Sequence, residues 1–212
     1  QARRITEGHH AGKIGDEARM AATVLGDYCY AGLPRSQLIT QAASEGCVVA
    51  ISDDGMQSPD LLPDVLVVVL RAEDPWGNGQ RLPAGPLREG PECLQRAQLI
   101  VWHGLDQELP SLPAEADERW VAAHYEVELP VLSDAKKIGV TTAIADPERL
   151  LRSLRSAGIS PQQHILVRDH GALPLASMDR DTTWLTTEKD IARHAHEKPV
   201  DLDFRAVKVR LK

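Results

Sequence analysis

Aromatic residues are scarce in this 212-residue sequence, at 4% of the total with a single phenylalanine. The core must therefore be built from Leu, Val, Ile and Ala, which favours the strands and Ala/Leu-rich helices of an α/β layer fold. Basic residues are not in excess, because 24 Lys+Arg stand against 31 Asp+Glu for a formal charge of -7. This balance argues against a nucleic-acid-binding protein that relies on a basic surface.

Long apolar runs are also missing, and none approaches the roughly 18 to 20 residues needed to cross a bilayer. The amino-terminal residues lack the basic-then-apolar profile of a signal peptide. Three cysteines, Cys29, Cys47 and Cys93, have no metal-ligand spacing. We therefore expect neither a zinc site nor a disulfide framework, and a reducing cytoplasm fits best.

Several well-known sequence motifs are absent. The stretch from Gly8 to Lys13 has the outline of a phosphate loop, but its glycines are too close together and Ile14 replaces the magnesium-binding Ser or Thr. Nothing else matches G-x-x-x-x-G-K-[ST], and neither G-x-S-x-G nor H-E-x-x-H occurs. The sequence therefore shows no nucleotide cradle and no serine-hydrolase or zinc-protease site.

What the sequence does contain is an alternation of apolar runs and capped helical patterns. Unalternating apolar runs predict strands buried on both faces of a parallel sheet. Strands are predicted over 47–51, 65–70, 99–102, 138–144, 164–167, 182–185 and 204–211, and helices over 16–22, 34–45, 147–157 and 187–194. Asp146 is expected to cap the third helix, with Pro147 at its first position.

One segment stands out by its charge. Residues 106–128 hold seven acids against the single Arg119. Such a composition shift favours a boundary between subdomains, which predicts one part over 1–112 and another over 113–212.

Three stretches of the first part combine residues that could carry chemistry, and each has a simpler alternative. Asp53 and Asp54 end an apolar run, where open α/β sheets bind ligands, but Asp-Gly is also a strong turn signal. Asp16 opens a helical pattern and could carry chemistry, but acids at the start of a helix often only compensate the helix dipole. The loop over 75–91 has four prolines and four glycines, and Arg88 in it could meet phosphate or be solvated.

Two further stretches lie in the second part. His170 follows a short predicted strand and could be a general base, although a lone histidine is more often an ordinary polar residue. The helix that starts near Thr187 could bind an anion through its free N–H groups or merely be capped.

Taken in order, these segments resemble the tetraacyldisaccharide 4'-kinases, the lipid A 4'-kinases of Gram-negative bacteria. Each motif is weak alone, but six of them in family order cover nearly the whole chain. They are Ile14-Gly15-Asp16-Glu17, Ile51-Ser52-Asp53-Asp54-Gly55-Met56-Gln57, Gly77-Asn78-Gly79 with Leu82-Pro83-Ala84-Gly85-Pro86-Leu87-Arg88-Glu89, Ala145-Asp146-Pro147-Glu148-Arg149, Asp169-His170 and Thr187-Glu188-Lys189-Asp190.

The resemblance implies a P-loop-NTPase-like α/β fold, with a mostly parallel sheet flanked by helices and a smaller carboxy-terminal α/β subdomain. It implies transfer of the ATP γ-phosphate to the 4'-hydroxyl of a lipid A disaccharide 1-phosphate. The reaction would use Mg²⁺ and take place in the cytoplasm, in peripheral contact with the cytoplasmic face of the inner membrane.

The same resemblance assigns roles to six residues. Asp16 and His170 match the pair that draws the proton from the sugar hydroxyl. Asp53 and Asp54 match acids that manage magnesium, with Gln57 beside them as a cofactor-binding residue, and Arg88 matches an arginine that steadies phosphate charge.

This sequence departs from the family pattern in three places. Ser58 and Gly171 stand where a histidine and an aromatic or second histidine are common, and the family's Walker A loop would lie before Gln1. We therefore expect a carboxy-terminal portion of such a kinase, incomplete at its amino terminus. The alternatives are a catalytically silent, kinase-derived binding protein and an unrelated sugar-phosphate or nucleotide-sugar enzyme.

Overall fold

The structure is a computed structural model that describes residues 3–4, 15–104, 109–169, 171–194 and 201–212. The chain divides into two compact units. The first unit comprises residues 1–62 and 129–208, and the second comprises residues 63–128 and 209–212. This division differs from the expected 1–112 and 113–212. The acid-rich segment 106–128 contains strands that pair with other strands of the chain, so the chain does not divide within it.

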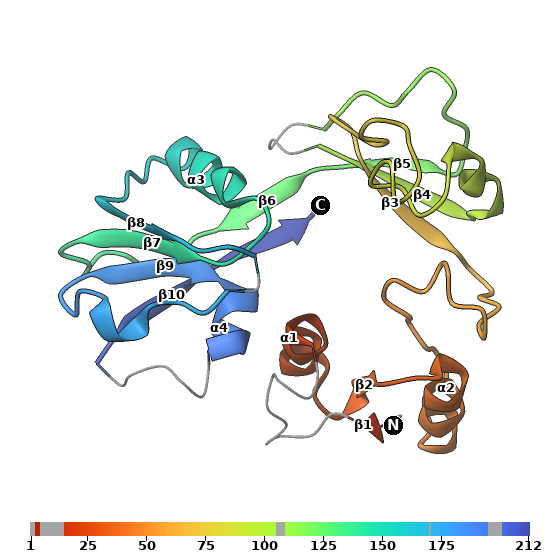
Figure 1. Cartoon of the computed structure of the whole chain (residues 1–212), viewed down its shortest axis with the longest axis horizontal. Coiled ribbons are helices and arrows are strands. Elements are labelled where there is room, and N and C mark those ends of the chain that lie inside the picture. Colours follow the sequence, from red (N-terminus) through yellow and green to blue (C-terminus); the bar gives the residue numbers. More distant parts are fainter. Residues whose placement is uncertain (1–2, 5–14, 105–108, 170, 195–200) are drawn as a thin grey trace. The chain divides into compact units, whose positions relative to one another are not determined.

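Parallel strand pairing dominates, as the sequence predicts. A five-stranded sheet has the order β6-β10-β9-β7-β8, in which β7 pairs in parallel with both β8 and β9, and β9 with β10. Figure 1 shows these strands running side by side. The bounds are Tyr125–Glu128 for β6, Ile138–Thr142 for β7, Gln163–Leu166 for β8, Thr183–Thr187 for β9 and Asp203–Leu211 for β10.

Two helices join the parallel strands of the first unit. Helix α3 (Pro147–Ser156) connects β7 to β8, and α4 (Glu188–His194) connects β9 to β10. Between β8 and β9 lies the short 3₁₀ helix η3 (Leu175–Ser177). Because the chain leaves β7 toward β8 and later returns to the opposite side of β7, the strand order reverses between β7 and β9. In open α/β sheets the crevice for ligands lies at the carboxyl ends of the strands at this point.

The start of α3 follows its sequence signals. The Asp146 side chain accepts a 3.1 Å hydrogen bond from the Arg149 backbone N–H, and Pro147 opens the helix. The helix then buries Leu150, Leu151 and Leu154, which lie on one face at helical spacing. Asp146 is therefore the cap that the sequence predicts.

Trp184 fills the centre of the first unit. Its side chain is fully buried on β9, and its indole N–H donates a 2.9 Å hydrogen bond to the carbonyl of Asp179, so that no polar atom of the ring is left unsatisfied. Gly139 on β7 lies against the ring, since a Cβ atom there would stand 2.6 Å from it. The absence of a side chain at Gly139 therefore makes room for the largest core residue.

The described amino-terminal segment of the first unit contains helices and a short strand pair. Helices α1 (Asp16–Leu25) and α2 (Arg35–Ser44) flank the 3₁₀ helix η1 (Gly26–Tyr28). Strand β2 (Tyr30–Ala31) pairs antiparallel with β1 (Arg3–Arg4). Cys29 is buried against alanines of α1, and burial raises the pKa of its thiol.

The strand predicted over 47–51 is wrong. These residues form neither strand nor helix, and Val48 and Ile51 are 97% and 94% exposed. A strand exists only where a neighbour pairs with its backbone. Among the residues that the structure describes, none pairs with this run, so its apolar side chains stay in contact with solvent.

The second unit contains a parallel sheet of the order β3-β4-β5. Its strands are β3 (Val67–Arg71), β4 (Leu99–His103) and β5 (Trp120–Ala123), and the 3₁₀ helix η2 (Pro91–Arg96) precedes β4. Leu70, Ile100 and Trp102 form its core with Ala97, and the Trp102 and Trp120 rings meet edge to face, 5.7 Å apart.

Among the described residues, one face of β3 is buried more deeply than the other. Leu70 is buried on β3, whereas Val67 and Val69 on the same strand are about half exposed. The strand is therefore where the sequence predicts it, but the expected burial on both faces is wrong. Among the described residues, none of the helices is both long and apolar enough to span a lipid bilayer.

Candidate functional site

The acidic loop, defined here as residues 52–60, is a tight turn that carries three of the predicted site residues. Asp54 has a φ of 48°, a left-handed conformation that is uncommon for a residue with a side chain. At the next position a Cβ on Gly55 would lie 2.7 Å from the Ser52 hydroxyl and 3.1 Å from the Ser52 carbonyl oxygen, so a side chain there would require Ser52 to shift. Strained backbone of this kind persists only where its surroundings hold it in place.

Arg35, the first residue of α2, holds the acidic loop. Its Nη1 donates hydrogen bonds to the Asp54 carbonyl at 2.7 Å, to the Ser58 hydroxyl at 3.0 Å and to the Ser52 hydroxyl at 3.3 Å. A single guanidinium therefore fastens both limbs of the turn from the start of the helix.

Asp60 fastens the end of the loop to the same helix. Its Oδ2 accepts a 2.9 Å hydrogen bond from the backbone N–H of Ser36, one of the N–H groups that an α-helix leaves unpaired at its start. This bond lowers the pKa of the Asp60 carboxyl below its ordinary value. The carboxylate thus caps α2, and the loop and the helix are locked together at two points.

The predicted metal ligands are accessible in this loop. Asp53, Asp54 and Gln57 are all exposed. Among the described residues, none forms a hydrogen bond or ion pair with the Asp53 carboxylate. Carboxylate oxygens are ligands that Mg²⁺ prefers, and Mg²⁺ is often held by only one or two carboxylates together with substrate phosphates. The donor set therefore fits Mg²⁺, although the described residues contain no cluster of three or more His, Cys, Asp or Glu that could hold a metal ion.

Asp16 is the first residue of α1, and the start of this helix is linked to α4. The Lys189 ammonium lies 3.2 Å from the carboxylate of Glu17, the residue after Asp16. The other predicted member of the catalytic pair, His170, lies outside the described residues, as does the stretch Gly8 to Ile14. Asp169, next to His170, follows β8 at the carboxyl edge of the sheet.

The helix start at Thr187 is capped. The Thr187 hydroxyl accepts a 3.1 Å hydrogen bond from the Asp190 backbone N–H and donates a 2.8 Å bond to the Asp190 carboxylate. This reciprocal pairing resembles a capping box, with Asp in the third helical position in place of Glu. It supports the capping interpretation of this motif over anion binding.

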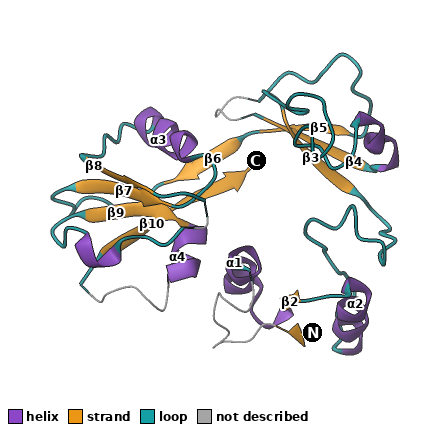
Figure 2. Cartoon of the chain, in the orientation of Figure 1, coloured by secondary structure: helices purple, strands orange, loops and turns teal. Residues whose placement is uncertain are grey.

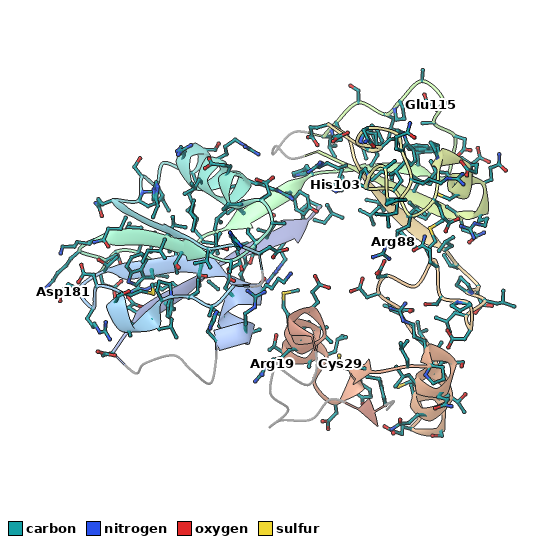
Figure 3. The ribbon with its side chains drawn as sticks, viewed as in Figure 1. Arg19, Cys29, Arg88, His103, Glu115 and Asp181 are labelled. Carbon is teal, nitrogen blue, oxygen red and sulfur yellow. The ribbon has the colours of Figure 1, made fainter. Side chains whose placement is uncertain are left out.

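Arg88 belongs to the second unit, in the segment between β3 and β4, which is loop apart from η2 (Figure 2). The Asn78 side chain orders this segment by donating to the Ala84 carbonyl and accepting from the Gln80 N–H, both at 3.0 Å. Leu82 N–H also donates to the Leu87 carbonyl at 2.8 Å. Arg88, labelled in Figure 3, is exposed on this ordered loop.

The structure therefore gathers Asp53, Asp54 and Gln57 on one loop and places Asp16 at a helix start. Sequence reasoning missed Arg35 as the residue that holds the acidic loop, and it missed the burial of Asp190. No local pattern marks Arg35, because its bonding partner Asp54 is 19 residues away. In the sequence, Asp190 stands only as the last residue of the Thr-Glu-Lys-Asp motif, and nothing there indicates its burial.

Parallel strand pairing with helical connections defines the class of protein as an open α/β fold. Across residues 1–212 the sequence matches the family model described as tetraacyldisaccharide-1-P 4'-kinase. The chain belongs to this family.

Individual relatives agree with the family match. The chain is 33% identical over 194 residues to the tetraacyldisaccharide 4'-kinase of Gluconobacter oxydans, and 32% identical over 202 residues to that of Bradyrhizobium diazoefficiens. These alignments cover 85% and 87% of this chain. The chain spans 58% of the length of each of these two relatives.

One solved structure shares the fold. It is LpxK from Aquifex aeolicus in complex with ATP, with a TM-score of 0.77 and 20% sequence identity, and the likeness covers all of this chain and 70% of that one. The predicted fold class, a mostly parallel α/β kinase-like fold, is thereby confirmed.

Proposed function

We propose that this chain functions in a tetraacyldisaccharide 4'-kinase. This enzyme transfers the γ-phosphate of ATP to the 4'-hydroxyl of a tetraacyldisaccharide 1-phosphate. The observation that carries the proposal is the family match over all 212 residues. Its geometric support is the acidic loop, whose exposed carboxylates are held on a strained turn by Arg35. The accessible Asp53 carboxylate suits a metal-binding role better than a structural one.

In this reaction a bond forms between the γ-phosphorus and the sugar oxygen while the bond to the β-phosphate oxygen breaks. Asp16, supported by His170, takes the proton that leaves the 4'-hydroxyl. Arg88 steadies negative charge on the phosphate oxygens. Such a transfer depends on positioning and charge stabilisation more than on covalent chemistry.

Asp53 and Asp54 are the residues that would hold Mg²⁺, and Gln57 would contact the nucleotide beside them. When bound, the metal ion neutralises charge on the β- and γ-phosphates. The Arg35 contact to the Asp54 carbonyl fixes the backbone of both acids, so that their carboxylates stay on one exposed turn. The phosphate loop that cradles ATP in other P-loop kinases has no counterpart in these 212 residues.

The substrate determines where the enzyme works. A tetraacylated disaccharide is a lipid, so its sugar hydroxyl is presented at a membrane surface. We place the protein in peripheral contact with the cytoplasmic face of the inner membrane, where ATP is available. Sedimentation with vesicles that contain the acceptor lipid tests this placement.

The test of function is phosphate transfer from radiolabelled ATP to tetraacyldisaccharide 1-phosphate by the full-length protein, measured over a range of Mg²⁺ concentrations. Asp53→Asn and Asp54→Asn should each lower kcat by about 100-fold or more, since a metal ion contributes several kcal/mol to transition-state stabilisation. Asp64→Asn, a change in an exposed acid just beyond the acidic loop, is the matched control. Lipid binding without turnover by the unchanged protein would favour a silent binding protein and contradict the proposal.

A further inference from the structure

Asp190 is a buried acid at the point where the strand order reverses between β7 and β9. Its side chain is 0% exposed. Thr142 Oγ1 donates a hydrogen bond of 2.6 Å to its carboxylate, and the Ala143 N–H lies 3.2 Å from Oδ1. Both donors belong to the end of β7, so this carboxylate joins α4 to the carboxyl edge of the sheet.

The other contacts to this carboxylate come from the end of β9 and from α4. The Thr187 hydroxyl donates at 2.8 Å, and the Arg193 guanidinium lies 3.6 Å from Oδ1 with its own side chain 11% exposed. A buried carboxylate is costly unless it is hydrogen-bonded and paired. This one accepts hydrogen bonds from β7 and from the end of β9, and these bonds hold the first turn of α4 against β7.

The next link leads from α4 to α1. Lys189 precedes Asp190 in the same helical turn and forms the 3.2 Å ion pair with Glu17. Only 20% of the Lys189 side chain is exposed, so its stem is largely covered by protein. Glu17 in turn follows Asp16 at the start of α1. The direction in which Lys189 projects is therefore set by the turn that Asp190 holds.

A second link leads from Asp190 to the end of β8. Thr142, its hydrogen-bond donor, is the register partner of Leu166, the last residue of β8. The Thr142 carbonyl also accepts a 2.9 Å hydrogen bond from the Val167 N–H, the first residue beyond β8. Asp190 thus contacts the β7 residue that also holds the end of β8.

We propose that Asp190 is a positioning residue for phosphate transfer, an inference that rests on the proposed function. Through Lys189 and Glu17 it fixes the start of α1, which carries Asp16. Through Thr142 it fixes α4 to the end of β7. A single buried carboxylate thereby holds the helical turn whose lysine pairs with the start of α1.

The kinetic test uses three variants of the full-length protein. Asp190→Asn keeps the shape of the side chain but replaces one of the two acceptor oxygens with an NH₂ group. This variant should lower kcat at least tenfold, and its KM for Mg-ATP should stay within twofold of that of the unchanged protein. Lys189→Met should lower kcat about threefold to tenfold without a change in Tm, because a partly exposed ion pair contributes little to stability. The exchanged pair Lys189→Glu with Glu17→Lys should recover most of the loss.

A merely structural role predicts something else. Asp190→Asn would then reduce the folded fraction, but the folded molecules would keep the kcat and the pH profile of the unchanged protein. Lys137→Met provides the matched control, since it removes a lysine from an ion pair with Asp179, at 3.4 Å, that makes no link to α1. Its kcat should equal that of the unchanged protein.

Hydrogen exchange of the α1 amides separates this inference from the proposed function. Asp190→Asn and Lys189→Met should both speed exchange over residues 17–22, and Lys137→Met should not. Unchanged α1 exchange and full kcat in Lys189→Met would overturn the positioning role. If the unchanged protein showed no turnover, the proposed function would be overturned. Even then, faster α1 exchange in Asp190→Asn and Lys189→Met would support the link from Asp190 to α1.

Discussion

Arg35 Nη1 donates a 2.7 Å hydrogen bond to the carbonyl of Asp54, the one residue besides glycine in the described part of the chain with a positive φ. The pairing joins the strained point of the acidic loop to the first residue of a helix. Because the bond is made to the backbone, it supports the strained turn without using the carboxylates. The loop can therefore be rigid and still present its acids to a ligand.

Removal of the Arg35 guanidinium should loosen the acidic loop. We expect Arg35→Met to weaken local protection of the loop by roughly 1 kcal/mol, the net contribution of a few partly exposed hydrogen bonds. Hydrogen exchange over residues 52–58 measures this change. Arg152→Met, which alters an exposed arginine of α3, should leave this exchange unchanged. Equal exchange in both variants would show that the loop does not depend on Arg35.

Local signals in the sequence were reliable where the cause is local. Asp146 and Pro147 predict the start of α3 because a cap acts within three residues. The Asp-Gly pair of the acidic loop predicts a turn, and the turn is there. The parallel sheets follow from the order of apolar runs, which alternate with helices.

Non-local relationships could not be predicted in the same way. The exposure of Val48 and Ile51 depends on whether another strand pairs with them, which the run itself does not encode. Acids are mostly exposed, so Asp190 gave no sign that it would be fully buried. The acid-rich segment looked like a boundary, but it contains β5 and β6, whose pairing depends on partners elsewhere in the chain.

Gly139 is expected to tolerate no side chain. An added Cβ would meet the Trp184 ring at 2.6 Å in a fully buried environment, so Gly139→Ala should lower the free energy of unfolding by about 1–3 kcal/mol. Denaturant unfolding measures the loss. A double-mutant cycle with Trp184→Leu identifies the cause, since the cost of the added methyl group should fall once the ring is gone, and the contact with the Thr182 methyl group at 2.9 Å accounts for the remainder. An equal cost in both backgrounds would contradict the steric explanation.

The cap of α3 should contribute measurably to stability. Asp146→Ala removes the acceptor of the Arg149 N–H and should cost about 1 kcal/mol. Asp146→Ser keeps a capping oxygen and should cost less. Thermal unfolding of the two variants compares them directly, and an identical Tm for both would argue that the hydrogen bond adds nothing.

Asp179 should make the first unit sensitive to acid. Its carboxylate accepts from the Asp181 N–H at 3.0 Å and from the Thr182 hydroxyl at 2.8 Å, and these bonds, with a smaller contribution from Lys137, lower its pKa from 3.8 to about 2. A lowered pKa in the folded state means that the bonds stabilise the protein fully above pH 3.8, and that this stabilisation fades as the pH falls toward 2. The free energy of unfolding should therefore decline over that interval. Asp179→Asn should flatten the decline, whereas Lys137→Met should keep most of it, because the backbone N–H of Asp181 is the larger cause. Urea unfolding at closely spaced pH values measures both slopes, and a slope in Asp179→Asn as steep as in the unchanged protein would place the acid sensitivity elsewhere.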